Sequence, residues 1–133
     1  SGTASAPSLA FDADANEDTG LYLFAENNIG IASGGSVIGK WFLTPSIANN
    51  GTRTISADGM LSGILLIKHT QSGRPAIFWM HAIDGVVEVS DPAGVFSVTA
   101  GTASSSNIYL TGGTIVLENK SGSDSQYAIM FLG

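Results

Sequence analysis

The residues able to do acid–base chemistry in this 133-residue chain are few, and they complete no catalytic motif. The histidines are His69 and His81. His81 and Asp84 could belong to a Ser-His-Asp arrangement, in which a carboxylate orients the base of a nucleophilic serine. The serine would be Ser62 or Ser72. No G-x-S-x-G turn is present, and a serine-rich chain offers many such trios, so we expect no catalytic residues.

Carboxylates suggest a second chemistry, the hydrolysis of a glycoside by an acid and a base or nucleophile. The candidates are Asp84, Glu88, Asp91 and Glu118. Their spacing along the chain does not show which pair, if any, lies at the separation that hydrolysis needs. A small glycan hydrolase or lyase therefore stays an alternative, and a non-enzymatic protein is the expectation.

The acidic run of residues 12–18 (DADANED) has the alternating oxygen ligands that a Ca²⁺ loop needs. It departs from an EF-hand loop at two positions. Glu17 stands where the sharp turn requires glycine, and Leu23 stands where a bidentate glutamate closes the site. With no cysteine and two histidines, a zinc site is also incomplete. We expect a solvated turn, no metal and no cofactor.

A stretch at residues 76–83 carries the most informative pattern. Its period of two puts an apolar set on one face, expected in the core, and Trp79 with His81 on the other. An aromatic ring offers a platform for the C–H face of a sugar, and polar neighbours bind the hydroxyl groups. With Arg74 and Tyr109 added, these residues are our candidate glycan-binding site. The alternative is that Trp79 and His81 are buried between sheets or at a subunit contact.

Composition excludes several classes of protein. Lys and Arg number 5 against 11 Asp and Glu, giving a net charge of −6, and charged residues are only 12% of the chain. So few cations do not form a nucleic-acid surface. No apolar run approaches the roughly 20 residues that span a bilayer, so we expect no membrane insertion. The 17 glycines and many Ser, Thr and Asn residues are typical of a turn-rich, uncharged surface.

Short apolar or alternating runs, separated by turn residues, predict an all-β fold with almost no helix. Pairs of glycines at 34–35 and 112–113 indicate hairpin turns. Strand spacing of this kind is typical of a β-sandwich, and we expect a jelly-roll-like one. The expected strands are 8–11, 20–25, 29–32, 37–43, 52–56, 63–70, 76–83, 86–90, 95–99, 107–111, 114–119 and 126–132.

A change in composition near residues 45–51 predicts two parts: a stem at 1–45 with short strands and a β-sandwich domain at 46–133. The stem alone is too small and glycine-rich to bury a core, so oligomerisation would support it. The alternative is that its strands add to the C-terminal sheets of one monomer. Trp41 and Phe42 are expected to form a hydrophobic plug at the junction. The last strand is apolar on both faces, which predicts cover by a sheet or a neighbouring subunit.

Three stretches carry a sequence pattern that resembles one in a known family: residues 6–12 (APSLAFD), 16–22 (NEDTGLY) and 28–35 (NIGIASGG). Their order resembles a segment found repeatedly in tail fibres and tailspikes of bacteriophages. The resemblance covers roughly residues 3–37, and the pair Glu17-Asp18 before Thr19-Gly20 departs from the pattern. It implies a homotrimer, located in the virion, whose tip binds the host surface. It implies no catalytic residues.

The expected function is therefore non-enzymatic adhesion of a homotrimeric receptor-binding tip to a bacterial surface polysaccharide or lipopolysaccharide. Three weak sites acting together would supply much of the affinity. A purely structural alternative is a trimerisation and folding module at the end of an enzymatic tailspike. The glycan hydrolase or lyase is the second alternative.

Overall fold

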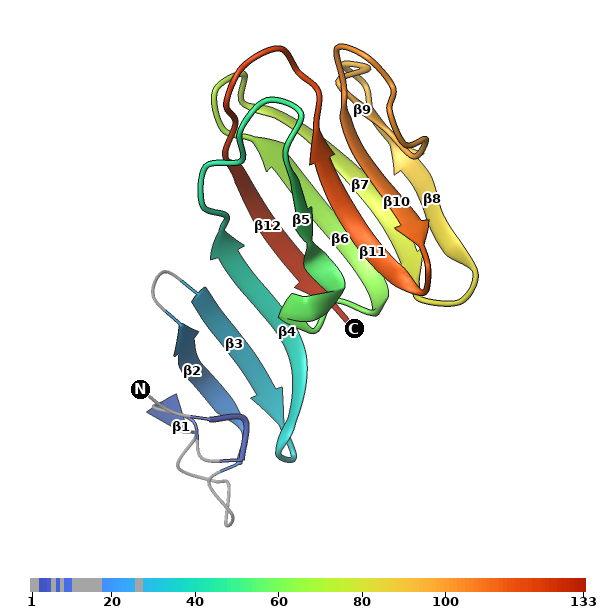
Figure 1. The fold of residues 1–133 in the computed structure, drawn as a ribbon. Coiled ribbons are helices and arrows are strands. Elements are labelled where there is room, and N and C mark those ends of the chain that lie inside the picture. The colour runs from blue at the N-terminus through green and yellow to red at the C-terminus, as the bar shows by residue number, and fades with distance from the viewer. Residues whose placement is uncertain (1–2, 6, 8, 11–17, 26–27) are drawn as a thin grey trace.

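The computed structural model describes residues 3–5, 7, 9–10, 18–25 and 28–133, and it is nearly all β (Figure 1). Within these residues the one helical element is a single 3₁₀ turn, η1 (Ile55–Asp58). The expected strands are confirmed to within a few residues. They are β1 (Leu9–Ala10), β2 (Gly20–Ala25), β3 (Asn28–Ser33), β4 (Ser36–Leu43), β5 (Thr52–Thr54), β6 (Ser62–His69), β7 (Arg74–His81), β8 (Gly85–Ser90), β9 (Phe96–Ser97), β10 (Ser106–Thr111), β11 (Thr114–Asn119) and β12 (Tyr127–Leu132).

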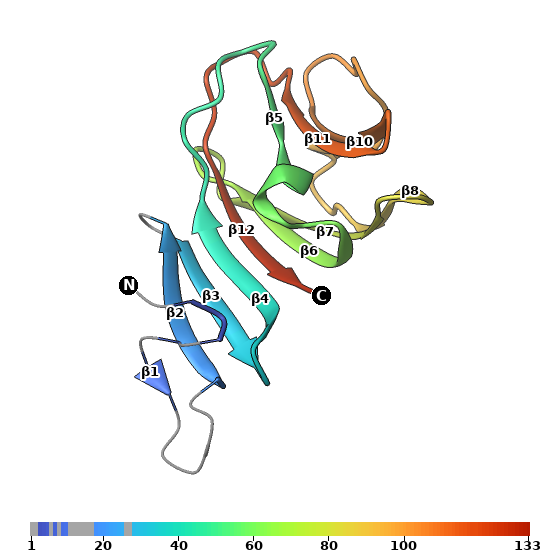
Figure 2. The same cartoon turned by 60° about the horizontal axis from the view of Figure 1, so that its bottom comes forward.

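The strands form two sheets that face each other (Figure 2). An eight-stranded sheet has the order β1-β2-β3-β4-β12-β6-β7-β8, and a four-stranded sheet has the order β5-β11-β10-β9. The pairing is antiparallel except between β9 and β10. The four-stranded sheet lies over β12, β6 and β7, whereas β1 to β3 project beyond it (Figures 1 and 2).

Hairpins connect most neighbouring strands, and they make the connectivity differ from the jelly roll we expected. Gly34 and Gly35 join β3 to β4, and Gly112 and Gly113 join β10 to β11, all with positive φ. Both predicted hairpins are thus confirmed. Such tight turns keep successive strands in one sheet, whereas jelly rolls are built from Greek keys. The eight-stranded sheet therefore consists of two meanders, β1 to β4 and β6 to β8, with β12 inserted between β4 and β6.

The core lies between the two sheets, where alternate residues of each strand meet. From β7 it receives Ala76, Phe78 and Met80, the apolar set that the period of two predicts. Phe96 packs edge-on against Phe78 with ring centroids 5.9 Å apart. The other members of the core cluster are Phe42, Ile47, Ile55, Met60, Leu65, Ile67, Ile108, Ile115, Leu117, Tyr127, Ile129 and Phe131.

The eight-stranded sheet runs without a break across residue 45, since β4 pairs with β12 from Leu43↔Ala128 to Gly39↔Leu132. The strands of the predicted stem thus add to the C-terminal sheet, which was the alternative to an independent stem. Within this part, the Tyr22 ring lies so close to Gly30 that a Cβ there would collide with it. The division of the chain at residue 45 into a stem and a β-sandwich domain stays a prediction.

Candidate functional site

The outward surface of the eight-stranded sheet, on the side away from the four-stranded sheet, is a continuous apolar face. Directly paired positions place their side chains on the same side of a sheet. One such row runs from Leu23 on β2 to Ile77 on β7. We name this surface the outer face; its large exposed residues include Leu9, Leu21, Leu23, Ile29, Trp41, Leu43, Ile64, Trp79, Val87, Met130 and Leu132.

The outer face is hollowed at its centre and almost uncharged. A shallow apolar groove of about 410 Å³ lies across β4, β12 and β6, with Trp41, Leu66 and Met130 among its walls. Among the outward residues of β4, β12, β6 and β7, Lys68 carries the single full charge. Soluble monomers rarely expose contiguous apolar surface on this scale, so the face is typical of an interface.

The four residues proposed for glycan binding do not come together. Trp79 and His81 share the outer face, as their spacing predicts. Arg74 begins β7, at the other end of the strand and on the alternate side. Tyr109 lies on β10 in the four-stranded sheet, opposite Val116, and faces away from the core. Within one chain the four residues therefore do not form a single site, because two separate sheets carry them.

Trp79 is 61% exposed in the single chain, in the midst of apolar neighbours. It lies directly across from Ile64 on β6 and Val87 on β8. Of the predicted plug, Phe42 is in the core and Trp41 belongs to the outer face, since neighbouring residues of a strand point to opposite sides. The surroundings of Trp79 resemble a subunit contact more than a sugar platform.

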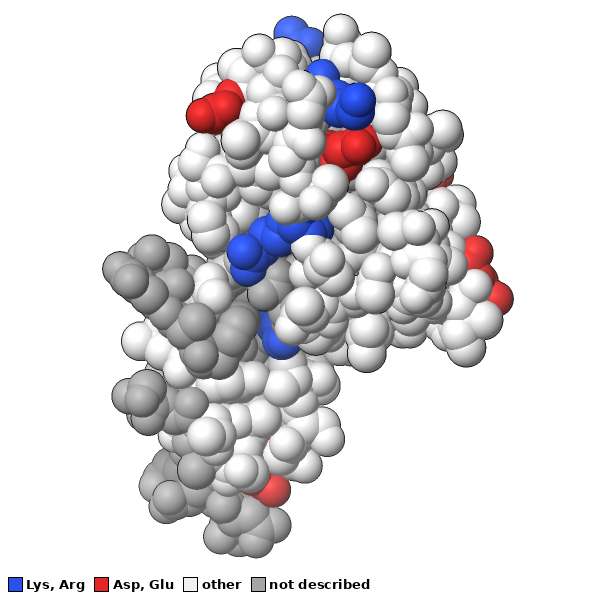
Figure 3. Space-filling view, in the orientation of Figure 1, with Lys and Arg blue, Asp and Glu red and all other residues white. Residues whose placement is uncertain are grey.

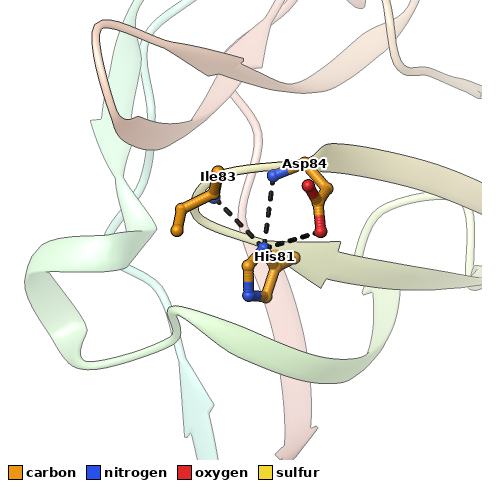
Figure 4. A network of polar contacts seen from close by, with 3 residues as sticks. All are labelled: His81, Ile83 and Asp84. Atoms are coloured by element: carbon orange, nitrogen blue, oxygen red, sulfur yellow. Dashed lines mark hydrogen bonds and ion pairs between the residues drawn. The ribbon is translucent and has the colours of Figure 1, made fainter.

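His81 makes a local polar network with the turn that follows it (Figure 4). Its Nδ1 accepts the backbone N–H groups of Ile83 and Asp84 at 3.3 and 3.2 Å, and it lies 3.1 Å from Asp84 Oδ2. Ser62 is the cross-strand partner of His81. In a catalytic triad Nδ1 donates to the carboxylate, whereas here it accepts two donors. The network therefore shapes the turn and does not prepare a base.

Two of the carboxylates proposed for hydrolysis, Asp91 and Glu118, are held in structural roles. Asp91 accepts the backbone N–H of Phe96 at 2.8 Å, which fixes the loop before β9. Burial alone would raise the pKa of Glu118, but hydrogen bonds from Asn107 and Gly101 and the charge of Lys120 together lower it. A general acid needs a raised pKa. Glu118 also lies on β11, in the other sheet from the strand that carries Glu88.

Asn107 faces the same way as Tyr109, as their alternation predicts, but it is fully buried. Its Nδ2 donates to the Thr102 carbonyl at 3.1 Å and to Glu118 Oε1 at 2.8 Å. Its Oδ1 is buried without a hydrogen-bond partner among the described residues, so Nδ2 makes all the bonds of this amide. Asn107 therefore fastens the β9–β10 loop to the sheet.

A cluster that sequence reasoning did not find surrounds His69. Its Nδ1 accepts the backbone N–H of Ser72 at 3.2 Å, and its Nε2 lies 2.9 Å from Ser125 Oγ. Because Nδ1 is an acceptor, Nε2 carries the proton and donates to Ser125. Burial lowers the pKa of His69, which favours the same neutral form. The signal in the sequence is the density of serine in residues 104–106 and 121–125.

The described part of the chain contains no three His, Asp or Glu side chains grouped to hold a metal ion. Of the acidic run at residues 12–18, where we expect a solvated turn, residues 12–17 lie outside the described residues. Among the described residues, no helix is long and apolar enough to cross a membrane. Figure 3 shows the face that carries the four-stranded sheet, where charged side chains are scattered among uncharged ones.

Comparison with known proteins gives no relative: no protein-family model, no curated protein and no solved structure matches this chain.

Proposed function

We propose that this chain is the homotrimeric receptor-binding tip of a bacteriophage tail fibre or tailspike, and that it adheres to a bacterial surface polysaccharide or lipopolysaccharide without enzymatic activity. The observation that carries the proposal is the outer face of the eight-stranded sheet. Further support is the resemblance of residues 3–37 to tail-fibre segments. The trimer, the fibrous stem and the virion location all belong to this proposal.

The argument for assembly is energetic. Apolar surface removed from water contributes roughly 25 cal/mol per Å² to an association, from which the entropy cost of association is subtracted. The outer face offers an aromatic and aliphatic surface, and aromatic residues are enriched at such contacts. Two bulky residues, Trp41 and Trp79, lie on separate strands of it. A cyclic trimer joins two different patches of one surface, and the groove near Trp41 and the exposed Trp79 provide two such patches.

Solution mass tests the assembly directly. Static light scattering behind size exclusion should give about 41 kDa, three times the 13.6 kDa of one chain. A mass of 13.6 kDa at micromolar concentration would contradict the trimer. The adhesion is tested separately, by binding of the labelled protein to an array of bacterial lipopolysaccharides and capsular polysaccharides. No binding to any of them would contradict adhesion.

A second candidate is a trimerisation and folding module with no ligand of its own. The location of Trp79 favours it, because the residue we assigned to glycan binding lies in the apolar face that assembly would cover. The two candidates differ in one measurement. A trimer that binds no polysaccharide supports the module, and a trimer that binds one supports the tip.

A further inference from the structure

A small pocket opens at the end of the sandwich opposite to β1, where several loops gather (Figure 1). Its volume is about 150 Å³. The pocket lies between the β6–β7 turn, the two loops on either side of β9, and the β11–β12 loop. Its lining is His69, Ser72, Val95, Ser104, Ser106 and Ser121.

The hydroxyl groups beneath the pocket are oriented by a chain of hydrogen bonds. His69 donates from Nε2 to Ser125 Oγ at 2.9 Å, and Ser125 Oγ lies 2.9 Å from Ser121 Oγ. Ser121 Oγ in turn donates to Asn119 Oδ1 at 2.7 Å. Asn119 and Ser125 are completely buried, so this chain of hydrogen bonds is anchored in the protein interior. Groups held in this way need no reordering when a ligand arrives.

Two more hydroxyl groups reach the same place. Ser106 Oγ bonds the buried Tyr127 hydroxyl at 2.6 Å. Ser104 has no hydrogen-bond partner for its side chain among the described residues, and its φ of 59° lies in the left-handed region that non-glycine residues seldom adopt. The loop therefore holds a free hydroxyl at the pocket.

The lining selects a chemical class of ligand. It contains hydroxyl groups and one imidazole, and burial lowers the pKa of that imidazole. It contains no Lys, Arg, Asp or Glu. The accessible surface of the pocket is mostly apolar and suits the C–H groups of a sugar, while the serine hydroxyls at its walls match the sugar's hydroxyls. The volume is well below the roughly 300 Å³ at which pockets for larger ligands begin, so one ring fits.

We propose that this pocket, and not Trp79, binds one uncharged pyranose ring of the surface glycan. The inference rests on the proposed function and gives it a site. The pocket lies at the end of the protein away from the strands of the predicted stem. A receptor would meet this end first. Three copies would present three such pockets, and linked weak sites raise avidity by roughly 10²–10⁴.

Ligand titration followed by ¹H–¹⁵N NMR tests the pocket on the intact protein. The probes are the methyl glycosides of glucose, galactose, mannose and N-acetylglucosamine, with glucuronic acid and glycerol as controls. At least one glycoside should move the amide signals of Ser104 and Ser121, and both controls should leave them unmoved. The inference is overturned if no glycoside moves them, or if glycerol moves them equally.

Substitution gives a second, independent test. Ser72→Phe fills the pocket from an exposed turn and should weaken binding of the responding glycoside at least tenfold. Ser123→Phe is the matched control, because Ser123 is exposed in the β11–β12 loop but does not line the pocket. Ser104→Ala, which removes the free hydroxyl alone, should weaken binding a few-fold. Equal binding by Ser72→Phe and the wild type would contradict the inference.

The polysaccharide array separates this inference from the proposed function. If wild type and Ser72→Phe adhere equally as trimers, the pocket is wrong and adhesion stands. If the wild type binds a methyl glycoside in the pocket but no polysaccharide, the pocket stands and adhesion is wrong.

Discussion

Phe78 and Trp79 are neighbours on β7 and lie on opposite faces of the eight-stranded sheet. Phe78 is completely buried under the four-stranded sheet, and Trp79 is 61% exposed. Their strand is apolar on both faces, so hydrophobicity alone does not separate the two environments. What differs is the cover: the four-stranded sheet covers the inner face, and no described residue of the chain covers the outer one. The inner face thus holds the monomer together, and the outer face is suited to join copies.

Truncation of the inner residue should have the largest effect. Phe78→Ala removes a ring from the closed core and should cost about 3–5 kcal/mol of unfolding free energy. Urea unfolding at two protein concentrations measures it, and the loss should be the same at both. Trp79→Ala is the matched control. It should act mainly by reducing the dependence of the unfolding free energy on protein concentration. Equal, concentration-independent losses for both variants would contradict the comparison.

A charge introduced on the outer face should have the next largest effect. Trp79→Asp puts a carboxylate where a partner would bury it, and an unpaired buried charge is strongly unfavourable. Light scattering should then give 13.6 kDa instead of about 41 kDa, with an unchanged circular dichroism spectrum. Thr114→Asp, at an exposed end of β11, should leave the trimer intact. A trimeric Trp79→Asp protein would place the subunit contact elsewhere.

Loss of a hydrogen bond at the polar edge of the inner face should lower the stability by a smaller amount. Tyr127→Phe leaves buried Ser106 without its 2.6 Å partner, at a cost of about 1–3 kcal/mol. Thermal unfolding followed by circular dichroism measures the loss. Tyr109→Phe is the control, since the Tyr109 hydroxyl has no hydrogen-bond partner among the described residues. A comparable loss in both variants would show that the buried contact is not the cause.

The smallest expected effect is a dependence on pH at His69. Burial lowers its pKa in the folded protein below the ordinary value of 6.5. As pH falls below 6.5, the unfolded chain takes up a proton before the folded one does, so stability falls. Melting temperatures between pH 7.5 and 5 should decline more steeply for the wild type than for His69→Gln. Parallel profiles of melting temperature against pH would mean that His69 does not contribute to the pH dependence of stability.

Local patterns in the sequence predict the strands and turns well. Alternation fixes which residues of β7 enter the core, and the paired glycines fix two hairpins, because both depend on neighbours along the chain. The outward direction of Tyr109 and Asn107 follows from the same period. The limit of this reasoning appears at Asn107, because the β9–β10 loop bonds to its side chain through Thr102, and alternation does not predict that the side chain is buried.

Long-range pairing explains what the sequence did not reveal. The place of β12 between β4 and β6 depends on residues far apart in the chain, and hairpin signals carry no information about it. The pocket beside His69 is assembled from four separate loops, so spacing could not predict it. The four glycan candidates failed as one site for the same reason, since the sheet to which each strand belongs is not a local property.

The insertion of β12 has a consequence for the order of folding. β4 and β6 are made first and can pair with β3 and β7, yet each lacks its other neighbour until residues 127–132 leave the ribosome and pair with both. Until then the eight-stranded sheet exists as two halves, each with an open edge that can recruit a strand from another chain. Contacts this distant in sequence close slowly. Pairing of β12 with both β4 and β6 is therefore the step that completes the eight-stranded sheet.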